Sequence, residues 1–217
     1  MSTKQKVLLT ATELFFTKGY SHTTIREISK LTGLSLGSIT NAVGSKDELL
    51  SSLITSILES YFEVIHSIAD KVTEDKLLYY AYERAVLLYI SEKDSRINEL
   101  LLNAYTLPSS THIINMIIVG KLKDIFIKYN SSLDERDFFE KEIANSGITR
   151  SFLSTPCTVY FSIERKIKAF LESSFLIFNV PKEEYLRAID FVNRIDYESV
   201  LKIINDSMMN IIKLNLE

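Results

Sequence analysis

Residues 45–69 carry the pattern that most restricts how this chain can fold. Ser45 is followed three residues later by Glu48, the arrangement of a capping box that begins a helix. Apolar side chains then recur at three- and four-residue spacing, which predicts a long helix. These positions are Leu49, Leu50, Leu53, Ile54, Ile57, Leu58, Tyr61, Phe62, Ile65, Ile68 and Ala69. A stripe this wide predicts a helix wedged between two layers of the protein.

The rest of the chain favours helices as well. Glycine occurs only 6 times in 217 residues, and no group of short strands bounded by turn residues is found. Further helices are predicted over about 4–18, 24–33, 36–43, 75–92, 95–105, 109–129, 135–145, 157–179, 182–194 and 196–215, with breaks at Pro108, Asn130–Ser132, Gly147, Pro156 and Pro181. We therefore expect an all-α fold with an N-terminal domain over residues 1–47 and a larger helical domain over residues 48–217.

The first three helices have the pattern of a helix-turn-helix. Thr24 and Glu27 have the spacing of a second capping box. The segment 33–35 (GLS) predicts a turn in which glycine takes the left-handed conformation and Ser35 caps the next helix. A small core is expected from Phe15, Ile25, Ile28, Leu34, Ile39 and Val43. The third helix would then present small side chains that can approach the bases of a major groove about 12 Å wide.

The net charge of −3 hides an uneven distribution along the chain. Residues 1–46 contain Lys4, Lys6, Lys18, Arg26, Lys30 and Lys46 but only two acidic residues, Glu13 and Glu27. The rest of the chain is acidic. Only the N-terminal domain is therefore suited to binding phosphates.

Several separated segments together resemble the TetR family of regulators. They are residues 11–20 (ATELFFTKGY), 23–28 (TTIREI), 33–35 (GLS), Gly37 and 45–49 (SKDEL). The resemblance implies a homodimer in which each N-terminal domain recognises half of a pseudo-palindromic double-stranded DNA operator. It also implies that each helical body binds a small-molecule effector, which releases a repressor from DNA.

By position, the resemblance also implies a set of DNA contacts. Thr24 would contact a phosphate, Arg26 would reach towards base edges, and Lys46 would bind a phosphate at a helix N-terminus. The full predicted set is Thr24, Arg26, Ser35, Leu36, Gly37, Ser38, Thr40, Asn41 and Lys46. The chain departs from the family where Thr40 replaces a usual tyrosine and where Asn41 and Ala42 replace an aromatic residue or histidine. Thr40 and Asn41 keep hydrogen-bonding groups, but with shorter reach.

Aromatic residues of the larger domain are candidates for an effector pocket, because such pockets are mostly apolar with a few polar anchors. The predicted lining is Tyr61, Phe62, Tyr82, His112, Met116, Phe126 and Phe161. Plain core packing is an equally good interpretation for each of them, and His112, near a predicted helix start, also fits a surface or capping role.

The last helices carry more apolar surface than one chain needs, which predicts a four-helix bundle across a two-fold axis. One set of positions is Val159, Phe161, Ile163, Ile167, Phe170, Leu171, Phe175 and Leu176, and the other is Val200, Leu201, Ile203, Ile204, Met208, Met209, Ile211 and Ile212. Extra core within one chain is the alternative. A two-fold dimer would place its two N-terminal domains one helical turn of DNA apart, about 34 to 36 Å.

Other classes of function have weaker signals. Glu59, Glu63, His66 and Asp70 share a helix side, but a solvated charged face is the preferred interpretation over a metal site, and no cofactor is expected.

Cys157 is the only cysteine, which excludes an intrachain disulfide and predicts a buried structural thiol.

No catalytic motif is found, so an enzyme is not expected. No signal peptide or membrane span is predicted, which favours the cytoplasm. The competing hypothesis is a helical small-molecule binding or adaptor protein whose N-terminal domain no longer binds DNA.

Overall fold

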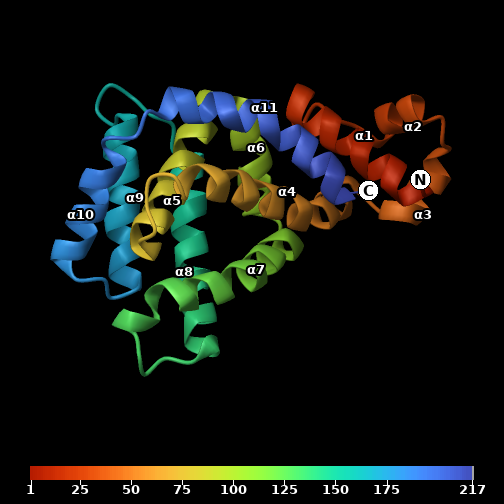
Figure 1. The fold of residues 1–217 in the computed structure, drawn as a ribbon. Coiled ribbons are helices and arrows are strands. Elements are labelled where there is room, and N and C mark those ends of the chain that lie inside the picture. Colours follow the sequence, from red (N-terminus) through yellow and green to blue (C-terminus); the bar gives the residue numbers. More distant parts are fainter. Residues whose placement is uncertain (217) are drawn as a thin grey trace.

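The protein is described by a computed structural model over residues 1–216, and these residues form helices without a strand. This confirms the all-α prediction. The N-terminal head consists of α1 (Thr3–Lys18), α2 (Ile25–Thr32) and α3 (Leu36–Val43), and the long α4 (Lys46–Ala69) connects it to the body (Figure 1). The body continues with α5 (Lys76–Lys93), α6 (Ser95–Ala104), α7 (Pro108–Phe126), the 3-10 turn η1 (Ile127–Tyr129), α8 (Glu135–Ser154), α9 (Ile163–Ile177), α10 (Lys182–Val192) and α11 (Tyr197–Leu216).

Side-chain caps begin the helices of the head. Ser45 and Glu48 form the predicted reciprocal capping box at the start of α4. At α2 the prediction is half right, because Thr24 accepts a hydrogen bond from the backbone N–H of Glu27 while the Glu27 carboxylate pairs with Lys18 instead. Glycine is required at position 33, where φ is +70°.

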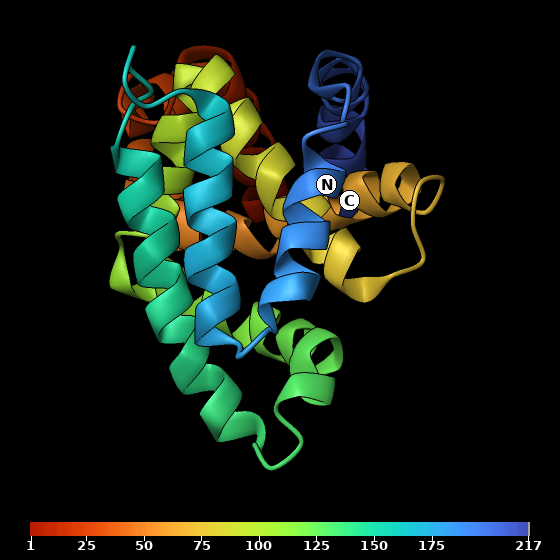
Figure 2. The ribbon, with the colours of Figure 1, turned by 90° about the vertical axis from the view of Figure 1, so that its left-hand side faces the viewer.

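Helix α4 lies between two layers, as its wide apolar stripe predicts. It packs against α7 on one side and α11 on the other (Figure 1). Helix α5 lies at the centre of the body, and all of its residues from 81 to 90 are buried. Figure 2 shows α8 and α9 side by side at the opposite edge of the body from α11.

Helix α8 is longer than predicted, because Gly147 does not end it. A glycine inside a helix costs about 1 kcal/mol relative to alanine. Asn145, Thr149 and Leu153 on either side of this glycine are buried against the body. Their packing outweighs the free-energy cost of glycine in the helix.

The predicted helix over 157–179 begins too early. Helix α9 starts at Ile163 with Ser162 as its N-cap, and residues 155–162 form a connection. Thr158 and Phe161 exchange backbone hydrogen bonds in a tight turn, which leaves Val159 97% exposed. Val159 and Phe161 therefore do not belong to a helical face. Cys157 in this connection is half-buried, not fully buried as predicted.

Four of the eight apolar positions of α11 that were predicted to face a second chain are used within this chain, whereas Ile203 is 42% exposed. The four are Val200, Ile204, Met208 and Ile212, which are buried where α11 packs on α4 and α5 of the same chain. The alternative of extra core within one chain is therefore correct for these residues. Among residues 1–216, no helix is long and apolar enough to cross a membrane.

Candidate nucleic-acid interface and the charged body core

The outward side of α3 consists of small and polar side chains together with Leu36. Ile39 and Val43 are buried towards α1, and Ser35 caps the helix by accepting a hydrogen bond from the backbone N–H of Ser38 at 3.1 Å. The predicted contact residues Leu36, Gly37, Ser38, Thr40 and Asn41 are all exposed, with Leu36 at 45%. We call these five residues the α3 face.

The start of α2 is exposed to solvent at Thr24 and Arg26. The Thr24 hydroxyl accepts a hydrogen bond from the N–H of Glu27 at 3.1 Å, so its side chain is used as the N-cap. Arg26 is exposed, and within residues 1–216 it has no ion-pair partner. Its guanidinium is therefore available to an external anion.

Lys46 has a structural role that the sequence did not indicate. Its ammonium donates hydrogen bonds to the carbonyls of Tyr20 at 3.0 Å and Thr23 at 3.3 Å. It also lies 4.2 Å from the centroid of the Tyr20 ring, and the Tyr20 hydroxyl donates to Asp47. Burial, together with Asp47, raises the pKa of Tyr20. Lys46 thus ties the α1–α2 connection to the start of α4, and it is only half-buried there.

Polar contacts join the head to the body. Arg96 at the start of α6 donates to the carbonyl of Thr17 at 3.1 Å, and Glu99 accepts from the N–H of Ser21 at 3.0 Å. Lys213 of α11 pairs with Glu13 of α1 at 2.7 Å. The second half of α1 and the α1–α2 connection are therefore held by α6 and α11 as well as by the other helices of the head.

The seven aromatic and neighbouring residues predicted to line one pocket lie in different places. Phe126 is fully buried and stacks on Phe178 in the core. Phe161 lies in the connection before α9, and His112 and Met116 are exposed on α7. The remaining three line separate cavities: Tyr61 an apolar one beside Phe16, Tyr82 one beside Phe191, and Phe62 a groove beside Lys121. The prediction of a single shared pocket is wrong, because helical spacing cannot show which helix faces meet.

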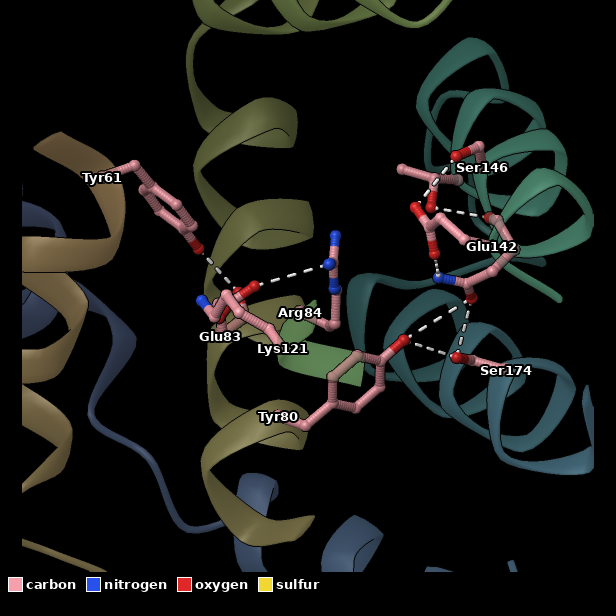
Figure 3. Close-up of polar contacts among 10 residues, drawn as sticks. Tyr61, Tyr80, Glu83, Arg84, Lys121, Glu142, Ser146 and Ser174 are labelled. Atoms are coloured by element: carbon pink, nitrogen blue, oxygen red, sulfur yellow. Dashed lines mark hydrogen bonds and ion pairs between the residues drawn. The ribbon is translucent and has the colours of Figure 1, made fainter. Parts of the chain in front are cut away.

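A network of charged and polar side chains is buried in the middle of the body (Figure 3). Glu83 of α5 pairs with Lys121 of α7 at 3.0 Å and approaches Arg84 at 3.5 Å. Arg84 is buried, and its Nε makes no hydrogen bond among the described residues. The Tyr61 hydroxyl of α4 donates to the backbone carbonyl of Glu83 at 2.6 Å. The network therefore connects α7 through α5 to α4.

A second group of buried polar side chains comes from α5, α8 and α9. The Glu142 carboxylate accepts hydrogen bonds from Asn145 at 3.0 Å and Ser146 at 2.9 Å. The Tyr80 hydroxyl lies 2.6 Å from that of Ser174, which donates to Asn145 (Figure 3). Burial raises the pKa of Glu142. Helical spacing did not reveal these buried polar groups, although two charged residues within the otherwise apolar α5 were a signal for them.

The charged side of α4 that carries Glu59, Glu63, His66 and Asp70 is exposed to solvent. His66 Nδ1 lies 3.0 Å from the Asp70 carboxylate, and both are exposed. In residues 1–216, no group of three His, Cys, Asp or Glu side chains is placed to hold a metal ion.

Comparison with known proteins identifies the head. Residues 7–53 match the profile of the family described as bacterial regulatory proteins, tetR family. The chain is 29% identical over 87 residues to the "Probable HTH-type transcriptional regulator YttP" of Bacillus subtilis (strain 168). That alignment covers 38% of this chain and 42% of the relative, so it spans less than half of the relative's length.

Among solved structures, the chain is similar to one titled "Crystal structure of gamma-butyrolactone receptor (ArpA like protein)". The TM-score is 0.44 at 15% identity, covering 92% of this chain and 96% of that one. The family match agrees in position with the motifs of residues 11–49 and with the three-helix head. Over residues 7–53, which include the three-helix head, the chain is therefore similar to the tetR family of bacterial regulatory proteins.

Proposed function

We propose that this chain is a transcriptional regulator that binds double-stranded DNA as a homodimer, acts as a repressor and is released by a small molecule. The observation that carries the proposal is the α3 face, which is exposed and, apart from Leu36, composed of small side chains. It is the second helix of a helix-turn-helix, the element that enters the major groove in such motifs. The family match of the head supports this assignment.

The charge of the head supports DNA as the ligand. Arg26 is exposed and has no ion-pair partner in the described chain, and Lys30 on the same helix is also exposed. The α3 face itself carries no acidic residue that would repel phosphates. Thr40 and Asn41 make no side-chain hydrogen bond within residues 1–216, so both are available to phosphate or base edges.

The second chain of the dimer has a candidate surface on α8 and α9. These helices pack against each other, and Ile143 and Leu176 remain 53% and 65% exposed. Both lie at one level, because Lys141 of α8 donates to the carbonyl of Ile177 of α9. A second copy would cover these residues and form a four-helix bundle from two helices of each chain.

Release by an effector would use the continuity of α4. This helix begins at Lys46 beside the head and extends to Ala69 in the body, with Tyr61 bonded to the charged network. A ligand that binds best to a body conformation in which the two heads no longer match the spacing of the DNA half-sites would reduce DNA affinity. The coupling free energy between two such sites is typically about 1 to 3 kcal/mol.

A selection of duplexes from random DNA tests the proposal. The purified chain should enrich a pseudo-palindromic sequence, and its affinity for that sequence should fall steeply as the salt concentration rises. Enrichment of no duplex would contradict the proposal and favour the helical adaptor protein instead.

Arg26→Ala gives a sharper test on the selected duplex. Arg26 makes no ion pair within the described chain, so the variant should fold normally while binding weakens by about 1 to 3 kcal/mol, the value of a base-directed arginine. Lys202→Ala is the matched control, because this exposed lysine of α11 lies in the body. Equal affinity of the two variants, measured by fluorescence anisotropy, would argue against contact of Arg26 with DNA.

A further inference from the structure

A groove on the body lies where the end of α4, the α4–α5 connection, α5 and α7 meet. Its volume is about 480 Å³, which is within the usual range for small-molecule sites. It is lined by Phe62, Glu63, His66, Asp70, Thr73, Glu74, Lys76, Tyr79, Lys121, Asp124 and Ile125. We call it the α4–α7 groove. Of the residues predicted from sequence to line a pocket, it contains only Phe62.

Aromatic rings in this groove already hold an ammonium group. Lys121 Nζ lies 3.2 Å from the centroid of the Phe62 ring and 5.8 Å from that of Tyr79. A cation over an aromatic face is attracted by the negative charge of the ring face. The groove is therefore shaped to place a positive charge on Phe62, and in the free chain its own lysine supplies that charge.

The other charges of the groove are mostly negative. Four carboxylates line it against two lysines, and both lysines are already paired, Lys76 with Asp124 at 2.5 Å and Lys121 with the buried Glu83 at 3.0 Å. Within residues 1–216, Glu63 and Glu74 have no ion-pair partner. An anion entering the groove would meet net repulsion, whereas a cation would meet two unpaired carboxylates.

From these observations we propose that the α4–α7 groove binds a small organic ammonium ion with an apolar group. The ligand ammonium takes the place of Lys121 Nζ over the Phe62 ring, and Glu63 and Glu74 balance its charge. The apolar group lies against Ile125 and the Tyr79 ring. Burial lowers the pKa of Lys121, which means that its ammonium is held there at a cost in solvation and is suited to displacement.

Displacement of Lys121 would be transmitted to α4. Lys121 leaves Glu83, whose backbone carbonyl accepts the hydrogen bond of Tyr61 (Figure 3). Because α4 begins at the head, the same groove would be the effector site. This last step rests on the proposed function, whereas ammonium binding does not.

Isothermal titration calorimetry on the full chain tests the binding. The probes are benzyltrimethylammonium and phenylmethanesulfonate, which share a benzyl group and a tetrahedral head but have opposite charge. The cation should bind saturably, and the anion at least tenfold more weakly at equal ionic strength. Equal binding of both probes, or no saturable binding of the cation up to millimolar concentration, would overturn the proposal.

Variants locate the site. Glu63→Gln and Glu74→Gln remove exposed, unpaired charges, so both proteins should fold and bind the cation several-fold more weakly. Glu140→Gln is the matched control, because this exposed glutamate lines a different groove beside Met116. Phe62→Leu keeps apolar volume but removes the ring, and should weaken binding by about 2- to 30-fold. Unchanged affinity in both glutamine variants places the cation elsewhere and rejects the groove.

DNA affinity separates this proposal from the proposed function. If the cation binds in the groove and the affinity for the selected duplex falls, both are supported. If the cation binds and the duplex affinity is unchanged, the transmission through Glu83 is wrong while the ammonium site stands. If no duplex binds under any condition, the proposed function fails, and calorimetry alone still decides the ammonium site.

Discussion

Glu142 has an unusual environment for a carboxyl group. It is buried in the body between hydrogen-bond donors from Asn145 and Ser146, and burial raises its pKa. The folded protein therefore retains the proton of Glu142 at pH values where the unfolded chain has released it. The stability that comes from the neutral form is fully present below the ordinary glutamate pKa of about 4.3 and is lost as the pH rises through the raised value.

Glu142→Gln should remove this pH dependence. Relative to the variant, the native protein should lose stability as the pH rises above about 4.3, at up to about 1.4 kcal/mol for each unit by which the folded pKa is raised. Chemical denaturation of both proteins across this pH range measures the difference. Glu140→Gln on the same helix is exposed and serves as the control. A constant difference between the native protein and Glu142→Gln would show that Glu142 does not titrate differently in the folded state.

At the scale of elements, two glycines differ in whether the backbone conformation at their position needs glycine. Gly120 is exposed and lies well inside the length of α7, and a Cβ added there would meet no atom within 4 Å. Gly33 ends α2 with φ +70°, a conformation that costs other residues about 1 to 2 kcal/mol. The first glycine is therefore dispensable to the fold, whereas the second is required by the turn.

Substitution by alanine should affect the two positions in opposite directions. Gly120→Ala should stabilise the protein by about 0.5 to 1 kcal/mol, because alanine loses less conformational entropy in a helix. Gly33→Ala should destabilise it by about 1 kcal/mol. Urea unfolding followed by circular dichroism compares them directly, and a destabilising Gly120→Ala would show that α7 is packed more tightly at this position than the structure indicates.

At the scale of the whole molecule, the exposed apolar residues of α8 and α9 are where the proposed dimer would form. Leu176→Glu should convert the dimer to a monomer, because a buried, unpaired carboxylate at the centre of the bundle would be costly. Leu186→Glu on α10 is the control, since Leu186 is also exposed but lies away from this face. Light scattering after gel filtration measures both masses. A dimer that persists in Leu176→Glu would place the two-fold axis on another surface.

Arrangement of the whole molecule also decides what the head contacts. Arg96 of α6 donates to Thr17 near the end of α1, Glu99 accepts from Ser21 in the α1–α2 connection, and Lys213 of α11 pairs with Glu13. Glu13 and Lys213 are 200 positions apart, so no local sequence pattern indicates such contacts. They link head orientation to the packing of α6 and α11 on the body.

The amino-acid sequence by itself determined the helical class, the order of the helices and the helix-turn-helix. Caps such as Ser45 and the turn at Gly33 act within a few residues, and an apolar stripe specifies its helix without knowledge of its partner. For the same reason, the sequence also indicated the exposed α3 face: Ile39 and Val43 on one side leave Thr40 and Asn41 on the other.

Only the tertiary structure decided which apolar faces meet and which charges become buried. Spacing cannot distinguish an apolar residue buried in the same chain, as Ile204 of α11, from one left exposed, as Leu176 of α9. The role of Lys46 depends on the carbonyls of Tyr20 and Thr23, more than twenty positions away. The α4–α7 groove likewise joins residues of three helices that only long-range packing brings together.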